Sequence, residues 1–275
     1  MKRLLIALIV LALGSPVAIR PADNTNARTQ TASKKKPPCK ASLADCPDEG
    51  CGTQFDPNLN RLKNIRSLDG EPTPRSLTWM KKLDDPENFS AGGSREELAG
   101  LGEGEKIRVV AYLLVAKPEG GESCNCGLTS PDATDNHLVL VTKATVDEFP
   151  LANTAKANAA VFHSRELQSE TAEFTPRVRL DHPNFTRATV QALIKRTPQQ
   201  ALLVRITGQL LFDSEHFIRH HLVRVNNWEI HPILKLEYCE NGNSCQVKSD
   251  DGWKSIDDLG QASKVVPGGT SGSLK

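Results

Sequence analysis

Histidines and carboxylates gather around two apolar segments in the second half of the chain. Glu229 and His231 are two positions apart, as are Asp135 and His137, so in a strand the two side chains of each pair point to the same face. Asp213 precedes His216 by three residues, a separation that fits a turn. If the strand ends that carry these residues converge, their imidazole and carboxylate groups could hold a metal. Such groups suit zinc or another divalent ion, and water bound to the metal would be a nucleophile near neutral pH. The candidate binding residues are His137, His182, Asp213, His216, Arg224, Trp228, Glu229 and His231.

The same residues also have a structural interpretation. A carboxylate near a histidine commonly satisfies the ring N–H group, and Arg224 would pair with Glu229 for the same reason. Trp228 would stack on a sugar or base, or pack against a core strand, which is commoner. His220 and His221 are adjacent, so on a strand they face opposite sides and form no joint chelate. The sequence leaves open the choice between a structural network and a divalent-metal site.

Familiar catalytic motifs are absent from the sequence. It contains no Gly-x-Ser-x-Gly, no His-Glu-x-x-His and no phosphate-binding glycine loop. No grouping of Ser, Cys and His has a spacing that identifies a nucleophile. No catalytic residue is therefore assigned, and the sequence does not decide whether the protein is an enzyme.

The elements that must position these residues are predicted strands. The apolar segments 202–212 and 230–238 have the length and composition of core strands. Earlier strands are predicted at 106–116, at 136–141 and within 160–174. Gly208 predicts a bulge or a bend in its strand.

One helix is predicted at 184–196, where apolar residues recur at helical spacing and Thr186 or Asn184 is available as a cap. Three strands, a helix and two strands are the element order of the oligonucleotide/oligosaccharide-binding (OB) barrel. We therefore predict a mainly β fold, a small five-stranded OB-fold-like barrel with one helix between strands three and four. A small sandwich is the alternative.

Composition divides the chain into five parts. The first residues are basic, then apolar and then small, which is typical of a signal peptide, and the apolar stretch is too short to span a bilayer. The mature protein is therefore predicted to be secreted or periplasmic and to lack a membrane span. The predicted parts are the signal peptide (1–18), a disordered basic linker (19–38), an irregular cysteine-containing extension (39–104), the barrel domain (105–245) and a tail (246–275).

Seven cysteines lie after the predicted signal peptide, where disulfides would persist. Cys239 and Cys245 flank an Asn-Gly turn, so we predict a disulfide between them. A bridge from the N-terminal cysteines to Cys124 or Cys126 would tie the extension to the barrel, whereas a bridge between Cys124 and Cys126 would be strained. The N-terminal spacings do not match a structural zinc site. An odd number leaves one thiol without an internal partner.

Bulk charge does not identify a partner. The formal charge is +1, from 34 basic and 33 acidic residues. Basic residues and histidines are concentrated between Arg177 and Arg224, which permits an anionic ligand. Aromatic residues make up only 5% of the chain, too few for the stacking platform of a single-stranded nucleic-acid binder.

Three segments resemble a group of uncharacterised secreted bacterial proteins. They are Glu173-Phe-Thr-Pro-Arg177, the run from Arg205 through Gly208 to Asp213 and His216, and Trp228-Glu-Ile-His-Pro232. They match the patterns E-x-T-P-R, R-x-T-G-x-L-x-F-D-x-x-H and W-E-I-H-P. The resemblance covers about half of the chain and implies export and a shared domain. It implies no activity.

The expected function is that of an exported, non-enzymatic binding or interaction module with a rim rich in histidine and carboxylate, whose ligand the sequence does not identify. The alternative is a metal-dependent hydrolase of the phosphodiesterase or nuclease type that uses the same rim. Fold analogy does not choose between them.

Overall fold

The computed structural model describes residues 39, 42–52, 56–86, 89, 92–219, 223–242 and 244–260, without the side chains of 217–219. The predicted signal peptide, the predicted linker, His220 and His221 lie outside the described residues. Among the helices of the described part, none is long and apolar enough to cross a membrane.

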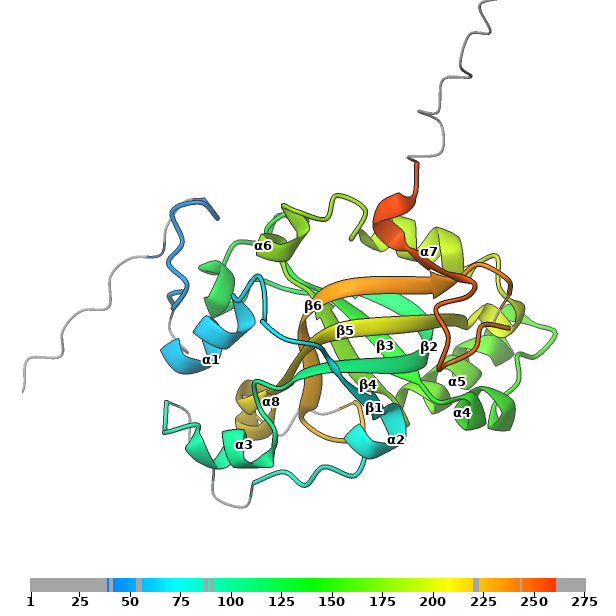
Figure 1. Cartoon of the computed structure of the whole chain (residues 1–275), viewed down its shortest axis with the longest axis horizontal. Coiled ribbons are helices and arrows are strands. Elements are labelled where there is room, and N and C mark those ends of the chain that lie inside the picture. Colours follow the sequence, from blue (N-terminus) through cyan, green and yellow to red (C-terminus); the bar gives the residue numbers. More distant parts are fainter. Residues whose placement is uncertain are drawn as a thin grey trace, which may run out of the picture. The chain divides into compact units, whose positions relative to one another are not determined.

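Five strands form a closed barrel (Figure 1). Neighbouring strands are antiparallel except β4 and β6, which are parallel. The barrel closes because β2 pairs with β3 along one part of its length and with β5 along the other. This confirms the predicted mainly β, five-stranded barrel. The strands are β2 (Lys106–Pro118), β3 (Asn136–Val141), β4 (Glu170–Phe174), β5 (Leu202–Phe212) and β6 (Trp228–Cys239).

Two further strands extend the sheet. β1 (Thr73–Ser76), from the N-terminal extension, pairs in parallel with β2. β7 (Trp253–Ser255), from the predicted tail, pairs antiparallel with β6. The N-terminal extension and the predicted tail are therefore each joined to the barrel by backbone hydrogen bonds.

The helix predicted between strands three and four is α7 (Arg187–Ile194), which follows β4 and precedes β5. Thr186 caps it by accepting a hydrogen bond from the Thr189 N–H. Val190 and Ile194 are buried in the main core, where they pack with Phe185. The other described helices are α1 (Pro57–Lys63), α2 (Leu77–Met80), α3 (Glu96–Leu101), α4 (Lys143–Glu148), α5 (Ala155–Glu166), α6 (Pro176–Arg179) and α8 (Ser214–Arg219).

The strand predicted within 160–174 was too long, because α5 takes up its first half. The helix begins at a Thr154 cap and is rich in alanine, which favours helix more than any other residue. Arg165 anchors it through hydrogen bonds to the Phe149 and Gln199 carbonyls, both at 2.9 Å. These contacts with distant segments are not visible in the local sequence.

Gly208 marks an irregularity in the pairing of β5 with β6, in agreement with the predicted bulge or bend. The pairing register shifts on both sides of this residue. A Cβ atom there would be 2.5 Å from both the Pro232 carbonyl oxygen and a methyl group of Ile230. Only glycine allows this approach, and the approach sets the backbone next to His231.

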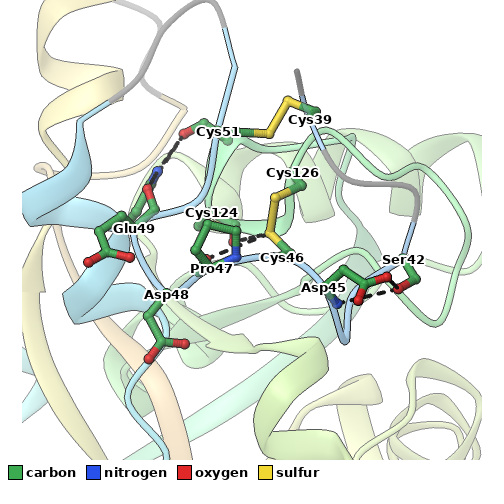
Figure 2. Close-up of a disulfide and its surroundings, with 12 residues drawn as sticks. Cys39, Ser42, Asp45, Cys46, Pro47, Asp48, Glu49, Cys51, Cys124 and Cys126 are labelled. Carbon is green, nitrogen blue, oxygen red and sulfur yellow. Dashed lines mark hydrogen bonds between the residues drawn. A yellow bond between two sulfur atoms is a disulfide. The ribbon is translucent and has the colours of Figure 1, made fainter. Parts of the chain in front are cut away.

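Three disulfides are present: Cys39–Cys51, Cys46–Cys126 and Cys239–Cys245. The predicted Cys239–Cys245 bridge is confirmed. So is the predicted tie between extension and barrel, which Cys46–Cys126 makes (Figure 2). The odd cysteine is Cys124, a buried free thiol.

Candidate functional site: a covered histidine and carboxylate cluster

Alternation along three strands places the cluster on the outer face of the barrel. Core residues of β3, β4 and β6 point inward, so the residues between them point outward. His137 on β3 lies opposite Glu173 on β4. The parallel pairing of β4 with β6 brings Glu229 and His231 beside them. We refer to Asp135, His137, Glu173, Asp213, His216, Arg224, Glu229 and His231 as the outer-face cluster.

Other segments cover this outer face, which is why most of the cluster is buried. The loop between β2 and β3, with its short 3-10 turn η1 (Ser123–Asn125), contributes part of the cover. Helix α1 contributes another part, because the Lys63 ammonium donates to Glu122 of that loop at 2.9 Å. Gln209 of β5 donates to the Leu62 carbonyl of α1 at 3.1 Å. The cluster is therefore an internal site made by covering the barrel.

His231 is the centre of the cluster and is fully buried. Its Nδ1 lies 2.9 Å from Glu229 Oε1 and 3.3 Å from Glu173 Oε2. Its Nε2 lies 3.4 Å from Asp135 Oδ2. His137, in turn, joins Glu173 to Glu119 of the covering loop, and its Nδ1 is 2.7 Å from Glu119 Oε1. Two imidazoles thus alternate with four carboxylates.

Arg224 links the two ends of the cluster. Its Nη1 donates to Glu229 at 2.8 Å and its Nη2 donates to Asp213 at 2.9 Å. Asp213 also accepts a hydrogen bond from the ring of His216. Because Asp213 is buried, its two cationic partners provide the stabilisation that water would otherwise supply.

The electrostatics follow from burial and from these contacts. Burial opposes protonation of His231, but the charge of Glu173 and the contacts with Asp135 and Glu229 outweigh it and raise the pKa of His231 to about 10. Burial also opposes ionisation of Glu229, but Arg224 and His231 lower its pKa to about 2. For Glu173 burial prevails over both histidines and raises the pKa to about 7.

A cavity of about 210 Å³ opens beside the cluster. Its wall contains His137, His216 and Arg224, and Lys117 and Glu119 also line it. The side chain of His216 is 36% exposed, whereas that of Arg224 is 5% exposed. The cavity therefore connects solvent with the edge of the cluster.

Two of the predicted site residues lie elsewhere. Trp228 faces the barrel core, where it packs on Phe212 at 5.3 Å between ring centroids and donates to the Asp84 carbonyl. Its burial excludes stacking on a ligand in this structure. His182 stacks on Phe185 and contacts Asp257 of the C-terminal segment at 2.8 Å. The other six predicted residues belong to the outer-face cluster.

Several members of the site have no sequence signal. Lys63 and Glu122 come from segments with little periodicity, and they meet only because the extension folds over the barrel. Glu119 directly follows β2 and contacts His137 of β3, at the other end of the loop that joins these strands. By contrast, Asp135 and His137 share the two-residue spacing of Glu229 and His231, and that spacing does identify them.

A larger cavity, of about 970 Å³, lies away from the cluster. Arg108, Tyr112 and Arg205 line it, together with residues of the C-terminal segment 244–250. Arg205 is bound to Glu237 and to Asp250. The larger cavity is therefore not the one beside the outer-face cluster.

Comparisons with protein-family models, with curated proteins and with solved structures found no match to this chain.

Proposed function

We propose that the protein is an exported, non-enzymatic binding module with an OB-like barrel, and that it binds a small anionic ligand in the cavity beside the outer-face cluster. The observation that carries this proposal is that Arg224 and His216 line the cavity while Asp213 holds both of them. Cationic groups that are already held in place lose little conformational entropy when an anion binds.

Within the described residues, both side chains keep N–H groups for a ligand. Arg224 donates to Asn226, Glu229 and Asp213, which uses three of its five N–H groups. His216 contacts Asp213 through Nδ1, and this hydrogen bond raises the pKa of the ring. The protonated ring therefore presents Nε2 as a second donor.

Export is supported by the three disulfides, since such bonds persist in oxidising compartments. The predicted signal peptide points the same way. The resemblance to secreted bacterial proteins agrees with export but stays a prediction.

Titration of the mature protein with inorganic phosphate, followed by calorimetry, tests the binding proposal. Because hydrogen bonds to charged groups contribute about 1.5–3 kcal/mol, His216→Ala should weaken phosphate binding at least ~10-fold. His182→Ala is the matched control, since it removes a histidine outside the cluster, and it should leave affinity unchanged. The proposal fails if the wild type binds no phosphate or if both variants bind equally well.

A second candidate function is metal-dependent phosphodiester hydrolysis. The specific observation in its favour is that Asp135, Glu173 and His231 place three metal-ligating atoms within 4.8 Å of one another. This function predicts that the mature protein cleaves a chromogenic phosphodiester and that a chelator abolishes cleavage. Phosphate binding without any cleavage would leave the binding module as the function.

A further inference from the structure

Three buried ligand atoms at the centre of the outer-face cluster make no well-aligned hydrogen bond within the described residues: Nε2 of His231, Oδ2 of Asp135 and Oε2 of Glu173. The first two lie 3.4 Å apart, and the third lies 3.3 Å from Nδ1 of His231. All three side chains are 0–1% exposed. Buried polar atoms are nearly always hydrogen-bonded, so three such atoms close together require an explanation. A bound cation would replace the proton on Nε2 of His231 and would contact all three.

The opposite atom of each side chain is already held. Asn125 donates to Oδ1 of Asp135 at 2.9 Å. Glu229 lies 2.9 Å from Nδ1 of His231, and His137 contacts Oε1 of Glu173. Metal sites use such outer contacts to orient their ligands, most often a carboxylate on the far nitrogen of a ligating histidine. Each of the three side chains also brings a ligand atom to within 4.8 Å of the other two.

We propose that Asp135, Glu173 and His231 bind a divalent cation between the outer face of the barrel and the loop that covers it. One imidazole with two carboxylates is a donor set that suits zinc or manganese, whereas calcium and magnesium prefer oxygen donors alone. The site goes beyond the anion-binding proposal, because its ligands are buried and do not line the cavity. It uses the same three residues as the second candidate function but does not depend on hydrolysis.

A neighbouring group of possible ligands is already satisfied. Glu122 and Cys124 lie within reach of Asp135. However, Glu122 Oε2 accepts from Lys63 at 2.9 Å and from the Cys124 thiol at 3.1 Å. The Lys63 ammonium supplies the positive charge on that side, so the cation belongs on the His231 side of Asp135.

Zinc titration of the mature, tag-free protein after chelator treatment tests this site, with elemental analysis of the protein as first purified. We expect one equivalent of Zn²⁺ in the wild type. Asp135→Asn keeps the size and the Asn125 contact but weakens the ligand, so affinity should fall at least ~100-fold, beyond the 10–100-fold typical of outer contacts. His182→Ala should bind zinc like the wild type.

A wild type that takes up no zinc or manganese overturns the proposal, as does an Asp135→Asn variant that binds zinc with unchanged affinity. If that variant does not fold, anomalous diffraction from zinc-soaked wild-type crystals decides instead. A peak about 2.0–2.1 Å from His231 Nε2 supports the site, and a peak elsewhere or no peak overturns it. Phosphate titration of the chelator-treated protein separates this outcome from failure of the anion-binding proposal.

Discussion

Glu170 is a carboxyl group buried on β4 without a hydrogen-bond partner for either oxygen among the described residues. Burial raises its pKa to about 8 from a usual value of 4.5, although Arg224 and Lys81 oppose the shift. The Glu170 carboxyl therefore ionises at a lower pH in the unfolded chain than in the folded protein. This carboxyl should lower the free energy of unfolding as pH rises from about 4.5 to about 8, with little change outside that window.

Glu170→Gln copies the neutral acid and should remove this slope. The variant should match the wild type near pH 5 and exceed it at pH 8, with a divergence of about 1.4 kcal/mol per pH unit where the slope is full. Urea denaturation at pH 5, 6.5 and 8 measures the difference. Parallel pH profiles for the two proteins would show that Glu170 is ionised in the folded state.

His216 should make anion binding depend on pH. Its hydrogen bond to Asp213 raises the ring pKa, and Arg224 and Glu229 also act on it. Affinity for sulfate, whose charge is constant in this range, should be full below the ring pKa and should fall as pH rises through it. Calorimetry across pH 6–10 tests this, with His216→Gln as the variant in which affinity is weaker and nearly flat. A wild-type profile as flat as the variant's would exclude His216 as a donor.

At the residue scale, local spacing predicted the pairs that a strand holds on one face. Glu229 with His231, and Asp135 with His137, are in the same cluster because the side-chain period of a strand is two. The same reasoning could not place His182, whose partner Asp257 is 75 residues away. Nor could spacing alone show that Trp228 faces the core while Glu229 faces outward, because adjacent residues face opposite sides only when they lie in a strand.

Strand β5 makes a very close contact with β6 at Gly208. Gly208→Ala would push a methyl group into the Pro232 carbonyl and Ile230, both 2.5 Å from the new carbon. Because backbone must move to relieve the clash, we expect a loss of about 1–3 kcal/mol in the free energy of unfolding. The backbone that must move belongs to β6, which also carries His231. The affinity for zinc or phosphate should therefore fall as well.

Gly100→Ala is the matched control for this change. Gly100 lies in α3, and a methyl group added there would meet no atom within 4 Å beyond its chain neighbours and its own helix backbone. The variant should therefore be as stable as the wild type or more stable by up to about 1 kcal/mol. Denaturant midpoints of both variants measure the contrast. Equal stability of the two variants would mean that β5 and β6 separate without cost.

At the element scale, the barrel was predictable because its strands are apolar, long and separated by turn signals. Helix α5 was not, since alanines such as Ala159 and Ala160 are exposed and the helix has no continuous apolar face. Its one buried residue, Arg165, binds carbonyls from two distant segments. Register and closure also lie beyond local sequence, because they depend on β2 pairing with two different strands.

For the whole molecule, the decisive feature is the tie between the extension and the barrel. The cover over the outer-face cluster consists of α1 and the loop that contains Cys126, and Cys46 of the extension is bonded to that loop. Arg177, which follows β4, adds hydrogen bonds to Asn64 and to the Cys46 carbonyl. Burial of the cluster therefore depends on residues that are distant in sequence.

Replacing both cysteines of this bridge by alanine should destabilise the protein more than removing Cys239–Cys245. The first bridge closes a loop of 80 residues and the second a loop of 6. The chain-entropy relation gives about 4.5 kcal/mol for the longer loop and about 2 kcal/mol for the shorter one. Denaturation of the two double variants measures the difference. If the two losses are equal, the extension stays folded on the barrel without its disulfide, and noncovalent contacts such as those of Lys63 and Arg177 hold the cover in place.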